Sequence, residues 1–260
     1  MKLFDQIPIE LVYFLTVAFA LFSSGIGYRF GLWLHKRNPD LKKDSSTGAL
    51  VGALLGLLAF LLTFTTSYAL EQFQKRRALV VADANAIGTA YLRADYLEEA
   101  GRNETKELLV EYVDLRLSSD DPADLGDILV RSEAIQTRLW EIAVEEGQSQ
   151  PSSQIIALYG EAINDLIDVH GSRLAVIIGS RLPALMWFML YGIVFVSFLL
   201  VGIASSAEGK RNYFTLILFA LGFASVLMLI TDLDRSQEGL LQVSQNALEN
   251  LQRQMGNFGN

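Results

Sequence analysis

The sequence predicts an all-α integral membrane protein with four transmembrane helices and a helical extramembrane domain inserted between spans two and three. The first observation is the distribution of charge. The 260-residue chain contains four long uncharged runs, at residues 11–28, 45–70, 182–207 and 212–231, and a helix of about 20 apolar residues crosses a bilayer core. The second is that apolar residues elsewhere recur at helical spacing, with no alternating stretch that would indicate a strand.

The formal charge of −8 belongs mostly to one region, because residues 71–182 hold 20 Asp and Glu against 11 Lys and Arg. An acidic balance offers no clustered basic face, which excludes nucleic acid as a partner. The chain has no cysteine, so disulfides and cysteine-based zinc sites are excluded as well.

Residues 1–70 are predicted to form a transmembrane hairpin, with spans at residues 9–30 and 47–70. The first apolar run is longer than the core of about 7–15 residues in a signal peptide, so we expect it to be a true span. Nothing that breaks a helix follows the second span. We therefore expect one continuous helix from about residue 47 to about residue 99.

Residues 71–182 are predicted to form the acidic, helical extramembrane domain. Val80, Ala84, Ile87 and Tyr91 are spaced by four, three and four residues, the pattern of a helix packed on another. Gly101 to Asn103 are expected to end that helix and cap the next. Further helices are predicted at residues 104–117, after residue 121 and after residue 152.

Residues 183–235 are predicted to form a second transmembrane hairpin, with spans at residues 183–206 and 212–231 around a short basic turn. The tail, residues 236–260, has the pattern of an amphipathic helix and is expected to pack on the extramembrane helices. The chain therefore reads as a multi-pass protein of the plasma (inner) membrane, with the lipid bilayer as its first partner.

The orientation follows from the Lys and Arg residues of the short loops. The first hairpin carries Lys36, Arg37, Lys42 and Lys43, which favours cytoplasmic hairpins and a periplasmic extramembrane domain. Residues 75–77, Lys-Arg-Arg, follow span two on the opposite side and favour the reverse orientation.

Few residues of the sequence could act as catalytic groups, and no nucleophile–base signature or phosphate-binding loop is present. His170 lies near Asp165 and Asp168 in sequence, which would allow a carboxylate–histidine relay. The alternative is that Glu161, Asp165 and Asp168 form a solvated acidic face, and this is the interpretation that we adopt. We expect no enzyme activity and no cofactor.

A cluster of acidic residues, Asp120, Asp121, Asp124 and Asp127, is a weak candidate for a hard cation such as Ca²⁺. It lacks the glycine and the distal glutamate of an EF-hand loop. The competing interpretation is that Asp121 caps a helix whose first turn contains Pro122. Apart from this candidate, no metal site is predicted.

A strip of small residues in span two, Gly48, Gly52 and Gly56, recurs every four residues. Such strips let two membrane helices approach closely and are typical of helix packing. The partner is either span one, which contains Gly25, Gly27 and Gly31, or span two of a neighbouring copy.

The segment after this strip contains the candidate pore-lining residues, Phe60, Thr63, Phe64 and Ser67. In a homo-oligomer, rings of phenylalanine around an axis would form a hydrophobic constriction, and hydroxyl rings would replace part of an ion's hydration shell. The alternative is that the hydroxyls bond to carbonyl groups one turn back while the rings face lipid. No charged residue lies within a span core, which disfavours proton-coupled carriers.

Three segments, AFLLTFT (residues 59–65), RRALVVADANAIGTAYLRADYL (residues 76–97) and YVDLRL (residues 112–117), resemble a family of uncharacterised bacterial membrane proteins known as bestrophin-like. The resemblance implies a relation to bestrophins, which are pentameric anion or cation channels with a hydrophobic neck on the second span. It implies neck-like positions for Phe60 and Phe64, and a cytosolic helical domain.

Two hypotheses follow. The first is a homo-oligomeric ion channel for inorganic ions, with span two lining a hydrophobic constriction. The second is a non-conducting, membrane-anchored scaffold or sensor that binds a protein partner through its acidic extramembrane domain.

Overall fold

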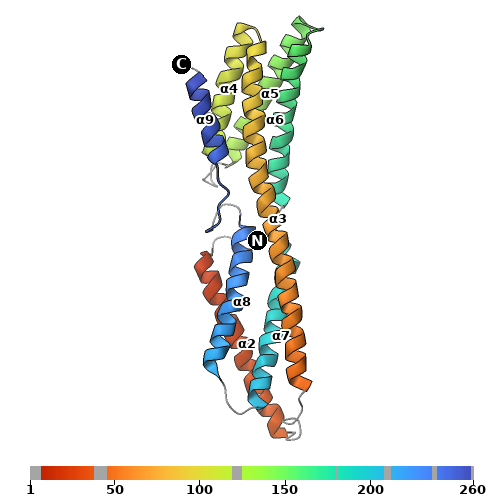
Figure 1. The fold of residues 1–260 in the computed structure, drawn as a ribbon, viewed down its shortest axis with the longest axis vertical. Helices are drawn as coiled ribbons and strands as arrows, with labels where there is room; N and C mark the ends of the chain where they lie inside the picture. Colours follow the sequence, from red (N-terminus) through yellow and green to blue (C-terminus); the bar gives the residue numbers. More distant parts are fainter. Residues whose placement is uncertain are drawn as a thin grey trace. The chain divides into compact units, whose positions relative to one another are not determined.

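A computed structural model describes residues 7–37, 46–118, 125–179, 181–207, 212–235 and 239–258. All the regular elements in these ranges are helical (Figure 1), which confirms the predicted all-α class. They are α2 (Ile9–Arg37), α3 (Ser46–Arg93), the 3₁₀ turn η2 (Ala94–Tyr96), α4 (Glu99–Leu117), α5 (Leu125–Ser149), α6 (Gln154–Gly179), α7 (Ala184–Ala207), α8 (Tyr213–Asp234) and α9 (Asn246–Phe258).

Four of these helices are long and apolar enough to cross a membrane: α2, the first part of α3, α7 and α8. This is the predicted number of spans, and the chain is a multi-pass membrane protein. It divides into two compact units, of which unit 1 contains residues 1–73 and 181–242, and unit 2 contains residues 74–180 and 243–260. Helix α3 contributes residues to both.

In unit 1, helices α2 and α7 cross at small residues. A Cβ atom added to Gly27 of α2 would collide with the backbone of Leu199, and one added to Gly202 of α7 would collide with the backbone of Ser24. In a bilayer, where burial from water does not drive helices together, such close approach supplies the dispersion contacts that hold them. Gly27 and Gly31 of span one therefore pack on span three of the same chain.

The core of unit 1 is completed by α3 and α8. Leu58 and Leu62 of α3 are buried together with Phe198 of α7 and with Leu227 and Ile230 of α8. These side chains form one apolar cluster, so all four spans belong to a single packed body (Figure 1).

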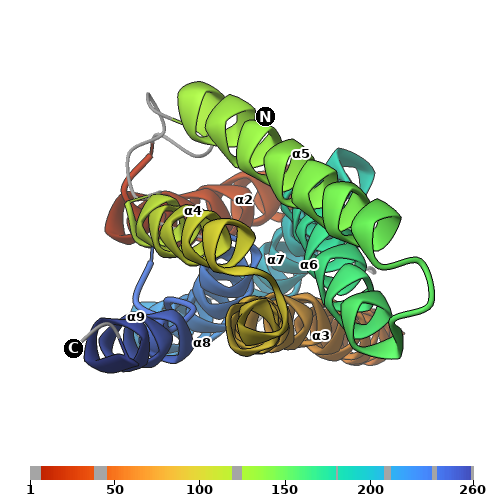
Figure 2. The ribbon, with the colours of Figure 1, turned by 90° about the horizontal axis from the view of Figure 1, so that it is seen from above.

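In unit 2, the second part of α3 packs against α4, α5, α6 and α9. The predicted seam residues Val80, Ala84, Ile87 and Tyr91 are all buried in its core. Helix α9 lies alongside α4 (Figures 1 and 2), and its Leu248 and Met255 enter the same core.

The predicted helix break at Gly101 to Asn103 is wrong. The chain turns earlier, at η2 and the extended residues Leu97 and Glu98, and α4 runs through Gly101 without interruption. Gly101 has a packing role instead, because a Cβ there would stand 2.6 Å from a carboxylate oxygen of Glu146 and 3.5 Å from Ile142. The glycine makes room for α5.

Candidate functional site

Helix α3 has two opposite faces within unit 1. Leu58, Leu62, Thr65 and Ala69 are buried and spaced by four, three and four residues. On the other side, exposed residues recur at the same spacing and form what we call the α3 stripe: Ala49, Ala53, Gly56, Phe60, Phe64, Ser67 and Glu71. With a helical advance of about 100° per residue, the stripe lies opposite the buried face.

The stripe changes chemistry along its length. It begins with small residues, continues with two aromatic rings, and ends with a hydroxyl and a carboxylate. Phe60 is 67% exposed and Phe64 60% exposed within the chain. Large apolar side chains on an open face mark a surface covered by lipid or by another protein.

Three threonine hydroxyls of this segment donate to carbonyl groups one turn back. Thr63 bonds to Ala59 at 2.9 Å, Thr65 to Leu61 at 2.7 Å and Thr66 to Leu62 at 2.7 Å. The bonding pattern that the sequence allowed as an alternative to a polar pore lining is therefore present. The oxygens keep acceptor lone pairs, so exposed Thr63 is able to receive a bond from water or to contact a cation.

Thr63 and Ser67 also line a groove of about 570 Å³ between α3 and α8. Leu218, Phe219 and Phe223 of α8 form much of its opposite wall. Of the four candidate pore residues, Phe60, Phe64 and Ser67 belong to the α3 stripe. Thr63 and Ser67 border the groove beside α8. The pore-lining role of these four residues stays a prediction.

The glycine strip of span two is not packed within the described part of the chain. Around Gly48, Gly52 and Gly56, no described atom lies within 4 Å of the position that a Cβ would take. Among the described residues, these three glycines do not contact span one, whose Gly27 and Gly31 pack against α7. Contact with a neighbouring copy stays a prediction.

A buried polar cluster lies in the core of unit 2 and joins three helices, α3, α4 and α6. Asp83 of α3 is 0% exposed and forms ion pairs with Arg173 of α6 and, at 3.4 Å, with Arg116 of α4. Arg116 also contacts the Tyr112 hydroxyl and Nδ1 of His170. A buried carboxylate paired with two guanidinium groups satisfies the rule that charges inside a protein are paired.

His170 is therefore a core residue and does not form the relay considered from the sequence. It is 4% exposed, whereas Asp165 and Asp168 of the same helix are exposed. Burial, and secondly the positive charge of Arg116, lowers the pKa of His170 to about 4. The ring is thus neutral at pH 7 and accepts a bond from Arg116.

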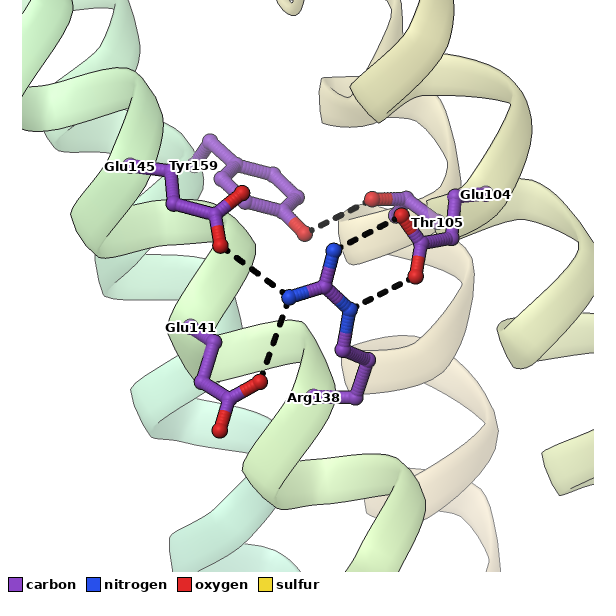
Figure 3. A network of polar contacts seen from close by, with 6 residues as sticks. All are labelled: Glu104, Thr105, Arg138, Glu141, Glu145 and Tyr159. Carbon is purple, nitrogen blue, oxygen red and sulfur yellow. Dashed lines mark hydrogen bonds and ion pairs between the residues drawn. The ribbon is translucent and has the colours of Figure 1, made fainter.

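An exposed network ties α4 to α5 (Figure 3). Arg138 of α5 donates to both carboxylate oxygens of Glu104, at 2.6 and 3.0 Å, and also to Glu141 and Glu145, each at 3.1 Å. The hydrogen bond from Arg138 holds the pKa of Glu104 below its usual value. The two bonds to Glu104 connect α4 with α5 at the surface, and the bonds to Glu141 and Glu145 lie within α5.

The acidic candidate for a cation site falls mostly outside the described residues. Asp120, Asp121 and Asp124 lie there, and Asp127 stands in the first turn of α5. Among the residues that the structure does describe, no group of three or more His, Asp or Glu side chains is arranged to hold a metal ion.

Sequence reasoning missed two features of these sites. Glu71 was not connected to Phe60 and Phe64, although the spacing of four, three and four residues runs through Ser67 to it. The pairing of Asp83 with Arg116 and Arg173 was also missed. The available signal was Asp83, a charged residue that lies three positions after Val80 and therefore on the same face of the helix.

Comparisons with known proteins identify the family and the fold of the chain. The family model described as "Bestrophin-like domain" matches residues 16–248. No curated protein matches the chain in sequence.

Solved structures are similar in fold. A variant of a bacterial bestrophin homolog from Klebsiella pneumoniae aligns with a TM-score of 0.70 at 18% identity, covering 97% of this chain and 99% of that one. A second variant of that homolog gives 0.70 at 17% identity over 95% and 97%. A structure described as a membrane protein variant gives 0.71 at 17% identity over 94% and 99%.

Proposed function

Because the chain belongs to the Bestrophin-like family, we propose that several identical copies assemble in the bilayer into a channel for inorganic ions, with the α3 stripe facing the axis. The single observation that carries the proposal is the stripe itself. It is exposed along its whole length while the opposite face of α3 is buried in the same unit. A second copy around an axis would cover what one chain leaves open.

In such a ring, Phe60 and Phe64 form the hydrophobic constriction. Rings of aromatic side chains narrow a pore and gate it by dewetting. The small residues before them, including Gly52 and Gly56, let neighbouring copies of α3 converge, since a glycine surface permits close approach of helices. The unpacked strip and the exposed rings thus have one explanation.

The test uses the purified protein in planar bilayers, with insertion confirmed independently. We expect ionic currents from the wild type and a larger conductance from Phe64→Ala, because a shorter side chain widens the constriction. Phe188→Ala is the matched control, since Phe188 is a 78% exposed ring on α7 that lies off the stripe. Silent bilayers, or equal effects of the two substitutions, would contradict the proposal.

A scaffold or sensor is the second candidate function, and the exposed apolar residues of α5 favour it. Val130 is 69% exposed, and Trp140 and Val144 share the open side of the helix. A partner protein would bind there if the chain does not conduct. Native mass spectrometry separates the two functions, because a closed ring supports the channel and a monomer supports the scaffold.

We place unit 2 outside the membrane and, from the basic first hairpin, in the periplasm. The chain has no cysteine, so a single Glu161→Cys substitution on the exposed side of α6 reports the side directly. A membrane-impermeant maleimide should label this variant in intact cells. Labelling only after lysis would put unit 2 in the cytoplasm instead.

A further inference from the structure

A groove of about 570 Å³ lies between α2 and the start of α8 in unit 1. On its α2 side, Phe22, Ile26 and Arg29 follow one another at spacings of four and three residues, and all three are exposed. Tyr213, the first residue of α8, lines the groove as well. Residues at these spacings share one face of a helix, so an apolar surface and a guanidinium group lie along the same groove.

Arg29 lies at the level of a membrane surface. It is 20 residues after Ile9, the first residue of α2, which corresponds to about 30 Å at a rise of 1.5 Å per residue and equals the thickness of a hydrocarbon core. Trp33, one turn beyond Arg29, is 48% exposed, as is typical of the aromatic belt at the membrane interface. Phe22 and Ile26 therefore face hydrocarbon, while Arg29 reaches the headgroup region.

The described acidic residues of unit 1 lie far from this groove along their helices. Glu10 is in the first turn of α2, and Asp232 and Asp234 are at the end of α8, whose start lines the groove. Glu71 is 25 residues after the start of α3. No hydrogen bond or ion pair joins Arg29 to another described residue. Within the described part of the chain, its positive charge is therefore available to a ligand.

We infer that the groove binds an anionic phospholipid of the bilayer, with the phosphate at Arg29 and an acyl chain along Phe22 and Ile26. A guanidinium group donates to two phosphate oxygens at once. Tyr28 and Tyr213 each have an interaction within the chain, so they form the wall of the groove, and the contact to the phosphate is assigned to Arg29.

The charge of the adjoining hairpins favours an anionic headgroup over a zwitterionic one. Residues 36–45 and 208–211 hold six Lys and Arg against three Asp and Glu, and basic segments beside a membrane attract anionic lipids. A zwitterionic lipid carries a cation next to its phosphate, which these residues repel. The site does not depend on whether the chain conducts ions.

The experiment measures lipid binding to the full chain in detergent by native mass spectrometry, with phosphatidylglycerol and phosphatidylcholine as probes. The wild type should bind phosphatidylglycerol more tightly. Arg29→Gln should weaken that binding about fivefold, the contribution of one Lys or Arg at an anionic membrane surface, and Arg29→Lys should retain most of it because the charge is kept. Arg253→Gln, at an exposed site of α9 in unit 2, is the matched control and should change nothing.

A second measurement distinguishes a lipid site from a site for a free anion. Phosphatidylglycerol should raise the melting temperature of the wild type more than that of Arg29→Gln, because a ligand of the folded state stabilises it. Inorganic phosphate should leave it unchanged, since phosphate has no acyl chain to cover Phe22 and Ile26. Stabilisation by phosphate alone, equal binding of the two lipids, or an unchanged affinity in Arg29→Gln would overturn the inference. An oligomer that retains no lipid would overturn it as well.

Discussion

Acidification should destabilise unit 2 through His170, which is buried beside Arg116 and in the same cluster as Asp83 and Arg173. Burial and the neighbouring positive charge lower the pKa of His170 from 6.5 to about 4. In the unfolded chain the imidazole takes up a proton near its ordinary pKa of 6.5, while in the folded chain it stays neutral down to about pH 4. Falling pH therefore favours the unfolded state.

The magnitude follows from the difference between the two pKa values. Between pH 6.5 and pH 4 the unfolded state binds one proton more than the folded state, and each pH unit changes the free energy of unfolding by about 1.4 kcal/mol. The expected loss is about 3 kcal/mol over this interval. Above pH 6.5 His170 does not change the free energy of unfolding with pH, and below pH 4 its destabilising contribution stays constant.

The assay is thermal unfolding of the full chain in detergent, followed by circular dichroism, with hydrogen exchange to locate the change in unit 2. The matched variant is His170→Asn, whose amide oxygen replaces Nδ1 as the acceptor for Arg116 and does not titrate. Subtracting the two pH profiles removes the contribution of carboxylates such as Glu104 and Glu111, whose pKa values are lowered by hydrogen bonds from Arg138 and Arg131. Parallel profiles between pH 4 and 6.5 would refute the reasoning.

The remaining predictions concern helix packing at glycines and one buried hydrogen bond. Gly202→Val should destabilise unit 1 by about 1–3 kcal/mol or more, as overpacking does, because the added Cβ meets the backbone of α2. Gly192→Ala should change the melting temperature little, since no described atom lies within 4 Å of its Cβ position. Gly52→Val should leave the monomer folded and weaken the oligomer in native mass spectrometry. An oligomer as stable as that of the wild type would argue against contact between copies at the glycine strip. Tyr159→Phe should lower the free energy of unfolding by about 1 kcal/mol, because the buried hydroxyl bonds to Thr105 at 3.0 Å, and an unchanged denaturation midpoint would count against that bond.

The helical seams could be predicted because their determinants are local. The positions of Val80, Ala84 and Ile87 repeat with the period of a helix, and all three are buried. The same local reading failed at Gly101, where glycine fits a helix end as well as a close contact. Only the side chain of Glu146, from another helix, distinguishes the two.

The candidate site was predictable in part for the same reason. The sequence identified Phe60 and Phe64 as sharing a face, and the structure leaves both exposed. The sequence could not predict which helix each glycine strip contacts, because Gly27 and Gly52 occur in similar patterns of small residues. Only the packed chain distinguishes them, with Gly27 against α7 and Gly52 open.

What the sequence by itself determined is the class: four uncharged runs, helical periodicity throughout, and a resemblance that the family match over residues 16–248 confirms. These properties are one-dimensional, since hydropathy and period are carried by neighbouring residues. The tertiary structure decided which charges meet. Asp83, Arg116 and Arg173 come from three helices and are separated by dozens of residues, so their pairing depends on how α3, α4 and α6 pack. Likewise, only the tertiary structure decided which face of α3 is exposed, because the opposite face packs in the core of unit 1.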